Sequence, residues 1–267
     1  SSNMNANEVI ANLASKASKQ KVDPNDDVNM SQSSNDVIPT AIKLSAHMDL
    51  TKKLIPSLDK LIVTIDKKAL SLKNMIKTGR THLMDAMPVD FSQELSAWSA
   101  QLKNSRKTLF FMEARLLEMP LGGTAVGTGI NAHPRFAKLF AKELSNLSGA
   151  KYKFVASENF FHELSAQDTA VQVSGELKNL AIVLMKISND LRWMNSGPLS
   201  GLSDIELQAL QPGSSIMPGK VNPVIPEAVA MVAADVIGND VTISVGAQSG
   251  NFQLNVMLPV IAYNLLK

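Results

Sequence analysis

Residues 40–77 read TAIKLSAHMDLTKKLIPSLDKLIVTIDKKALSLKNMIK, and the spacing of their apolar side chains decides the fold. These side chains recur mostly every three or four positions, and only Pro56 interrupts the pattern. This is the spacing of one face of an α-helix. A helix from Thr40 to about Lys77 would span roughly 55 Å at 1.5 Å per residue, more than most single domains need. The stretch therefore predicts a bundle of long helices.

The rest of the chain repeats this helical spacing. The expected helices are Met4 to Ser18, Ser92 to Glu118, Pro134 to about Leu147, Glu158 to Trp193, and the last segment of the chain. Pro226 to Gly246 is rich in small and β-branched residues, which favour a strand by propensity. Its length and its capped start favour a helix instead. Leu199 to Gln211 has no clear period. The sequence predicts an all-α fold, a bundle of very long helices.

The composition favours assembly into an oligomer. Of the 267 residues, 45% are hydrophobic and only 19% are charged, so the helices must cover much of their surface against other chains. A net charge of +2 gives no support for nucleic acid as a partner. No signal peptide and no run of 18 apolar residues is present, so we expect no membrane partner. The absence of cysteine excludes disulfides and thiolate metal sites, as in a cytoplasmic protein.

Residues 211–223, QPGSSIMPGKVNP, form the loop richest in groups that bind small anions. Gly213 and Gly219 allow backbone conformations that other residues avoid, and they permit a ligand to approach closely. They bracket two adjacent hydroxyl groups, Ser214 and Ser215. The loop predicts a binding site for a carboxylate or a phosphate. The competing interpretation is an ordinary surface loop, because Gly, Pro and Ser gather in many of them.

The second half of this loop adds charge. Lys220 supplies an ammonium group, and Asn222 with Pro223 predicts the cap and the first residue of a helix. The free N–H groups of that helix would face the same anion. The loop is not a Walker loop, because Val221 stands where that motif requires a hydroxyl.

A second polar loop runs from Lys21 to Asp36. It ends in Ser33, Ser34 and Asn35, three hydrogen-bonding side chains just ahead of a predicted helix that Asn35 or Asp36 would cap. A helix N-terminus is a natural place for a carboxylate. An ordinary capping loop explains the same residues equally well.

A third loop is expected at Gly79–Pro88, between two long helices. It contains His82, which titrates near neutral pH and can move protons or activate water. Asp85 follows three residues later and would orient His82. The competing interpretation is a structural histidine. Because long helices separate the three loops, we expect loops from different, antiparallel subunits to meet at one site.

Five segments of the chain resemble class II fumarases of the fumarase/aspartase superfamily, in the same order and over essentially the whole chain. They are SNMNANE at 2–8, PNDDVNMSQSSND at 24–36, GRTHLMDAMP at 79–88, GGTAVGTGIN at 122–131 and PGSSIMPGKVNP at 212–223. Within the superfamily, GGTAVGTGINAHP at 122–134 and PGK at 218–220 favour a fumarase. VIPE at 224–227 and LNVM at 254–257 are closer to aspartases.

The resemblance implies a homotetramer in which three subunits form each active site, and reversible hydration of fumarate to L-malate without metal or organic cofactor. Ser214 would remove the C3 proton of malate. His82 would position or protonate the departing water, coupled in charge to Glu227 of another chain. The remaining residues would hold the small dicarboxylate substrate and stabilise an aci-carboxylate intermediate: Ser33, Ser34, Asn35, Thr81, Ser215, Lys220, Val221 and Asn222.

The chain departs from the family pattern in two places, and each limits what the resemblance implies. The family's accessory dicarboxylate site would include Asn25 and Asp26, but Asp23 and Gln20 stand where its histidine and arginine belong, which puts that site in doubt. The family also has a Gly-Ser-Gly-Thr segment before the position of Ser1 and a small domain after that of Lys267. We therefore expect residues 1–267 to be the central helical domain, with reduced or no turnover alone. An aspartate ammonia-lyase and an inactive helical scaffold are the alternatives.

Overall fold

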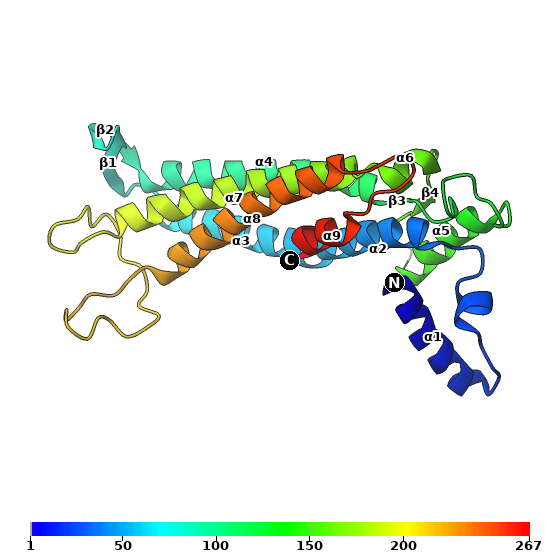
Figure 1. Ribbon diagram of the computed structural model, residues 1–267. Coiled ribbons are helices and arrows are strands. Elements are labelled where there is room, and N and C mark those ends of the chain that lie inside the picture. The colour runs from blue at the N-terminus through cyan, green and yellow to red at the C-terminus, as the bar shows by residue number, and fades with distance from the viewer. Residues whose placement is uncertain (1, 150) are drawn as a thin grey trace. The chain divides into compact units, whose positions relative to one another are not determined.

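The computed structural model describes residues 2–149 and 151–267, and most of them are helical (Figure 1). The helices are α1 (Ser2–Ser18), α2 (Ser34–Asp49), α3 (Ile55–Ser71), α4 (Phe91–Leu116), α5 (Phe136–Leu147), α6 (Phe160–Ser165), α7 (Asp168–Met194), α8 (Val224–Gln248) and α9 (Leu258–Leu266). The predicted all-α fold is confirmed in its main part. The exceptions are two small two-stranded sheets: β1 (Ile76–Thr81) with β2 (Met84–Asp90), and β3 (Glu118–Met119) with β4 (Val155–Ala156).

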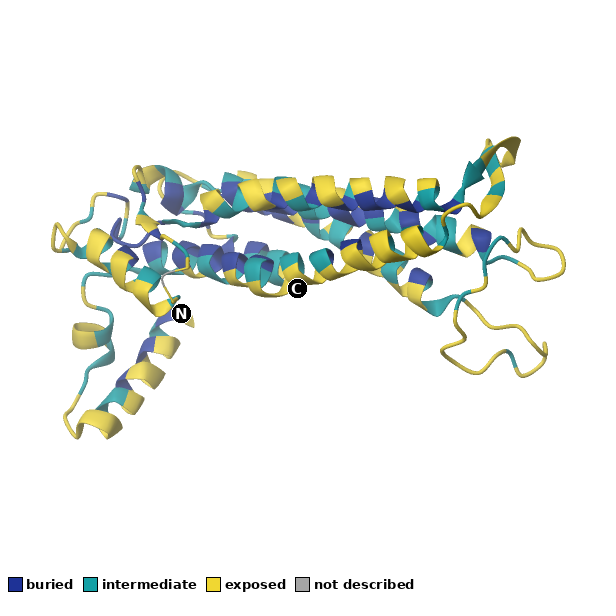
Figure 2. Ribbon diagram, turned by 180° about the vertical axis from the view of Figure 1, so that it is seen from behind, coloured by how far each residue is buried: buried dark blue, intermediate teal, exposed yellow. Residues whose placement is uncertain are grey.

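The chain divides into two compact units. The first unit contains Ser1–Lys53, Phe110–Ser174 and Val241–Lys267, and the second contains Leu54–Leu109 and Gly175–Asp240. The boundaries fall within α4, α7 and α8, so each unit holds part of these helices. Figure 2 shows buried residues alternating with exposed ones along the long helices, as expected for amphipathic segments.

The prediction of one continuous helix over residues 40–77 is wrong, both in where the helix begins and ends and in its continuity. It begins six residues earlier, at Ser34, and it is divided by a π-helical turn, η2 (Leu50–Leu54), just ahead of Pro56. Proline has no N–H to donate to the preceding turn, and a wider turn accommodates the missing bond. After Ser71 the chain leaves the helix and enters β1.

Other predicted boundaries also need correction. The run 158–193 is broken at Ala166, whose backbone is extended, so that α6 and α7 are separate helices. A short π-helical segment, η1 (Pro24–Val28), lies inside the predicted polar loop at 21–36. For 226–246 the predicted helix is confirmed within α8, and the strand that propensity alone allowed is excluded.

Apolar side chains cluster at the meeting points of several elements in the described part of the first unit. Met119, Ala141 and Phe154 pack where β3, α5 and β4 meet, and Ala170, Ile243 and Ile261 pack where α7, α8 and α9 meet. In the second unit, α3 is joined to α4 by polar contacts. Asp59 pairs with Arg106, and Asp66 accepts a 2.5 Å hydrogen bond from Ser99.

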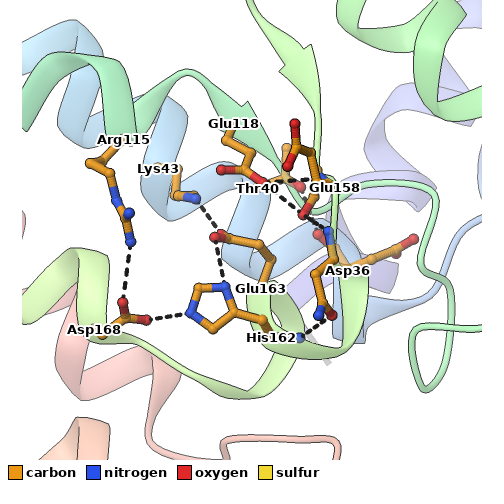
Figure 3. A network of polar contacts seen from close by, with 11 residues as sticks. Asp36, Thr40, Lys43, Arg115, Glu118, Glu158, His162, Glu163 and Asp168 are labelled. Atoms are coloured by element: carbon orange, nitrogen blue, oxygen red, sulfur yellow. Dashed lines mark hydrogen bonds and ion pairs between the residues drawn. The ribbon is translucent and has the colours of Figure 1, made fainter.

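A chain of ionic contacts crosses the first unit (Figure 3). Lys43 of α2 pairs with Glu163 of α6, and both side chains are almost completely buried. The ring of His162 lies between two carboxylates, 3.2 Å from Glu163 and 2.9 Å from Asp168. Arg115 of α4 completes the chain, 3.3 Å from Asp168. A buried ion pair needs partners for both charges, so the contact between Lys43 and Glu163 fixes how α2 and α6 lie against each other.

Helix α8 is unusually apolar and poorly covered. By length and composition it is the one helix among the described residues that could cross a membrane, but only 17% of its most apolar window is buried. Asp240 within it is buried and lies 2.5 Å from Lys178 of α7. An apolar helix that a single chain leaves exposed normally packs against another surface.

His47 should make the protein sensitive to acid. It is buried, and neither ring nitrogen has a hydrogen-bond partner among the described residues. Its ring packs edge-on against Tyr152 and Phe154, at 4.3 and 5.4 Å between centroids. Burial, and secondarily the charge of Lys52, lowers the pKa of His47 below its ordinary value of 6.5. The unfolded chain therefore binds a proton that the folded chain does not, so the stability that neutral His47 permits is present above pH 6.5 and is lost below it.

We expect the free energy of unfolding to fall by up to about 1.4 kcal/mol per pH unit below pH 6.5 through this residue. His47→Leu, of similar volume and without a titratable group, should remove this part of the slope. Urea unfolding at fixed protein concentration, compared from neutral to mildly acidic pH, measures it. Equal slopes in the two proteins below pH 6.5 would show that His47 is not the acid-sensitive group.

Candidate active site

His82 lies at the tip of a β-hairpin rather than in a loop. The segment 79–88 was predicted as a loop between helices, but it forms most of the antiparallel pair β1 and β2, labelled in Figure 1. Thr81 pairs with Met84, so His82 and Leu83 are the two turn residues, both with positive φ, at 54° and 61°. Two-residue hairpin turns favour Asn and Gly at such positions. A bulky residue held there is strained, and such strain is concentrated at functional sites.

Gly79 sets the shape of this hairpin. The register shifts between Thr78 and Arg80, which marks a bulge at Gly79. A Cβ atom on Gly79 would lie 2.5 Å from the backbone oxygen of Met87, so only glycine fits. The predicted contact between Asp85 and His82 is wrong among the described residues. Asp85 lies instead across the hairpin from Arg80, with its carboxylate 3.9 Å from Arg80 Nε.

A cluster of charges holds the base of the hairpin. Arg80 donates a 2.7 Å hydrogen bond to Asp204, which follows α7 in the chain, and this bond raises the pKa of Arg80 above its usual value. Lys77 lies 2.6 Å from Glu94 of α4 and 3.5 Å from Asp204. Two cations and two carboxylates thus tie the strand that carries Thr81 to α4 and to the segment after α7.

The loop 211–223 is irregular and closed at its base. The backbone N–H of Ser214 donates to the carbonyl of Lys220 at 2.9 Å. A Cβ atom added to Gly213 would lie only 2.7 Å from the same carbonyl oxygen, so a larger residue would clash there. Lys220 N–H in turn donates to Met217 O, and Gly219 has φ +81°. The tip is open to solvent, and Ile216 is 83% exposed. The closed base brings the Ser214 and Lys220 backbones together within one loop.

The helix that follows begins later than predicted. Asn222 was expected to cap it and Pro223 to be its first residue, but α8 begins at Val224. The carbonyl of Pro223 accepts the first helical hydrogen bond, from Glu227 N–H at 3.2 Å, so Pro223 occupies the cap position. Asn222 is exposed outside the helix.

An open hollow of about 890 Å³ in the second unit brings four of the predicted residues together: Lys220, Val221, Asn222 and Glu227. The end of α7 and the segment after it form its other walls. Both signs of charge line the hollow: the cations are Lys220 and Arg192, and the carboxylates are Asp204, Glu206 and Glu227. Ammonium, guanidinium and amide donors around an open hollow suit a small carboxylate.

The remaining predicted residues lie elsewhere. Ser214 and Ser215 share the loop with Lys220, but neither they nor Thr81 and His82 are among the residues that line the hollow. Ser33, Ser34 and Asn35 belong to the first unit, at the start of α2. The predicted cap at Asn35 or Asp36 is wrong: Ser33 is the cap, and its hydroxyl accepts from Asn35 N–H at 3.2 Å. Asp36 completes a capping box with Ser33.

The doubtful accessory residues Asn25 and Asp26 are exposed in η1. Their backbone N–H groups donate to Asp23, at 2.8 and 3.0 Å, which lowers the pKa of Asp23. Asp23 thus acts as a cap here. Among residues 2–149 and 151–267, no group of three or more His, Cys, Asp or Glu side chains is placed to hold a metal ion.

Sequence reasoning missed most residues of the hollow, among them Arg192 and Asn195. Arg192 lies in the last turn of α7, and Asn195 follows that helix and accepts a 2.7 Å hydrogen bond from Leu207 N–H. The available signal was an arginine and an asparagine next to the Gly197–Pro198 break at the end of a long helix. The aperiodic stretch that follows gave no way to place them.

Relatives of this chain are named as fumarate hydratases. The chain is 59% identical over 266 residues to fumarate hydratase class II 2 of Pseudomonas aeruginosa, covering 100% of this chain and 58% of that protein. It is 58% identical over 267 residues to fumarate hydratase class II of Xylella fastidiosa, covering 100% of this chain and 56% of that protein. The chain thus spans less than three fifths of the length of these relatives.

Solved structures show the same fold. The chain superimposes on the class II fumarase of Schistosoma mansoni with a TM-score of 0.95 at 40% identity, over 99% of this chain and 59% of that one. The corresponding values for a cobalt-bound fumarate lyase:delta crystallin of Brucella melitensis are 0.94 and 46%, over 99% and 58%. The family model described as lyase matches residues 1–238. The chain therefore belongs to the lyase family, and within it the chain is similar to class II fumarate hydratases.

Proposed function

We propose that the full-length protein, meaning this chain with the flanking segments that its relatives carry, catalyses the reversible hydration of fumarate to L-malate. The observation that carries the proposal is the closed loop 211–223, which joins Ser214 to Lys220 beside a hollow lined by Lys220, Asn222 and Glu227. In this proposal residues 1–267 form the central helical domain. A cytoplasmic location agrees with the absence of cysteine.

The chemistry divides between two residues. Ser214, as an alkoxide, takes the C3 proton of malate, and the electron pair of that C–H bond moves into the adjacent carboxylate to give the aci-carboxylate. His82 then donates a proton to the C2 hydroxyl, the C–O bond breaks, and water leaves as the double bond forms. Lys220 stabilises the alkoxide and the developing negative charge, because an ammonium group acts strongly once the neighbouring subunits of the proposed oligomer exclude water from the site. Glu227 would complement the charge on His82.

The other residues hold the substrate. Hydroxyl, amide and ammonium groups donate to its two carboxylates: Ser33, Ser34, Asn35, Thr81, Ser215, Lys220 and Asn222, with Val221 at the wall of the hollow. Donors of these types bind a carboxylate through charge-assisted hydrogen bonds. No metal or organic cofactor takes part in this mechanism.

The proposed site needs several subunits, and the exposed apolar surface supports a homotetramer. Helix α8 exposes Ile225, Met231, Val232, Val241 and Val245, and α4 exposes Phe110 and Phe111. Monomeric proteins seldom leave so much apolar surface uncovered. Packing these helices against copies of themselves would bury it, and antiparallel packing would bring loops from different chains to one site. We expect neither a nucleic acid nor a membrane partner.

The direct test is an assay of two reactions with one purified full-length protein. We expect L-malate to produce the ultraviolet absorbance of fumarate, and L-aspartate to release no ammonia. Aspartate ammonia-lyase is the second candidate, because residues 224–227 and 254–257 follow the aspartase style. Ammonia release without reaction of malate would establish that candidate. A protein inactive with both substrates would favour the inactive scaffold.

A further inference from the structure

We propose that Asp36 is a positioning residue that fixes Ser33, Ser34 and Asn35 against the turn Gly122–Ala125, so that these three residues present their donors to a substrate carboxylate. This inference rests on the proposed function. Asp36 has no exposed surface. One of its oxygens accepts from Ser33 N–H at 2.9 Å, and the other accepts from Gly122 N–H at 3.0 Å and Thr124 N–H at 2.8 Å.

These three hydrogen bonds come from two segments far apart in the sequence. Burial raises the pKa of Asp36, while the N–H donors of Ser33, Gly122 and Thr124 act in the opposite direction. Such donors are what makes a buried carboxylate tolerable. A helix cap alone needs only the Ser33 contact, so the contacts with Gly122 and Thr124 are beyond what α2 requires.

The turn is itself held rigidly in the first unit. Gly122 has φ +114°, and a Cβ atom on it would lie 2.5 Å from Cβ of Ala137 in α5. Gly123 packs on α6, where an added Cβ atom would lie 2.8 Å from Leu164. Thr124 is held at φ 55°. Asp36 therefore joins the start of α2 to a turn that cannot easily shift.

Asn35 makes a second link between the same two segments. Its side-chain Nδ2 donates to the carbonyl of Ala125 at 2.7 Å. An amide nitrogen carries two N–H groups, so this bond fixes the side chain and leaves one donor for a ligand. The contacts of Asp36 set the backbone of the loop, and the contact of Asn35 sets the direction of its amide.

The consequence is a specific kinetic signature. Ser33, Ser34 and Asn35 would contact a carboxylate that is present in both substrate and transition state. If these residues lose their alignment, the binding of the substrate and the binding of the transition state should weaken to the same extent. KM then rises and kcat stays nearly unchanged. A variant that is merely less stable has fewer folded molecules, which lowers the apparent kcat without raising KM.

Two substitutions in the full-length protein separate the contacts of Asp36. Asp36→Asn keeps the shape but has one acceptor oxygen, so either Ser33 or the turn loses its partner. Asp36→Glu keeps the charge and can still complete the capping box with Ser33, but its longer side chain displaces the oxygen that the turn binds. We expect KM for malate to rise at least about fivefold in both, with kcat within about threefold of the parent, since a buried donor loses its acceptor.

The matched control is Thr40→Val, on the same helix. Thr40 is buried, and its hydroxyl donates to the backbone oxygen of Asp36 at 2.7 Å, one turn from the loop (Figure 3). The Thr40→Val substitution perturbs the same buried region but removes no contact of Ser33, Ser34 or Asn35. We therefore expect KM and kcat to equal those of the parent. A rise in KM in both Asp36 variants and not in Thr40→Val supports the inference.

Three outcomes contradict it, and they are distinguishable. An active parent whose Asp36 variants keep the parental KM overturns the role of Asp36 and leaves the proposed function standing. Failure of both variants to fold shows that Asp36 serves the fold as a whole rather than the loop. A parent that does not convert malate removes the proposed function, and this inference falls with it.

Discussion

Ser214→Ala in the full-length protein should lower kcat for malate dehydration by about 10² to 10⁴-fold, the usual contribution of a positioned general base. The loop should keep its structure, because the contact that closes it joins the backbone N–H of Ser214 to the backbone oxygen of Lys220. KM should change little, since Ser215, Lys220 and Asn222 remain to hold the carboxylates. The rise of fumarate absorbance under saturating malate measures kcat, and size-exclusion chromatography with light scattering checks the oligomer.

Ser200→Ala is the matched control for this substitution. Ser200 is an exposed serine in the segment between α7 and the loop, and it does not line the hollow. We expect its kinetics to equal those of the parent. Turnover in Ser214→Ala within a factor of about three of the parent would exclude Ser214 as the base.

The helices were predictable where a single apolar face recurs without interruption. The predicted run 92–118 differs by only one or two residues from α4 at its ends, and α1 extends only two residues beyond the start predicted for 4–18. For 226–246 the propensities of its β-branched residues favoured a strand, but length and Ala-rich packing were the better guides, and α8 spans 224–248. Long apolar periodicity reflects burial on one side, so it is visible in one sequence.

The hairpin was not predictable from the same signals. Its turn residues, His82 and Leu83, are neither glycine nor asparagine, although both have positive φ. Strand β1 reads IKTGRT, with charges and glycine in place of the β-branched alternation that marks a strand. What holds it is tertiary, namely the pairing with β2 and the contacts of Lys77 and Arg80 with Glu94 and Asp204. Contacts of this kind leave no local pattern in the sequence.

The site was predictable only as separate motifs. Glycine and serine spacing at 211–223 marked the loop, and the structure closes it through Ser214 and Lys220. Arg192 escaped notice because nothing in the sequence says that the end of α7 meets the residues around Lys220. The sequence predicts Asp36 only as one of two alternative caps of α2, whereas its contacts with Gly122 and Thr124 depend on a turn 86 residues away in the chain. Pairings at such distances come from the fold.

The central claim, that Ser214 and His82 in one active site come from different chains, is tested most directly by mixing two inactive variants. Ser214→Ala and His82→Asn would be co-expressed with different tags, and oligomers that carry both tags would be purified. With random mixing, about a quarter of the sites combine an intact Ser214 with an intact His82 when two chains supply them. Ser214→Ala mixed with Lys220→Ala is the control, because one loop carries both residues and no site can recover both.

We predict that the first mixture regains about a quarter of the parental malate dehydration, and that the control mixture regains none. Activity in the first mixture no greater than that of the two variants assayed separately would contradict the account, because it would place Ser214 and His82 of each site on the same chain.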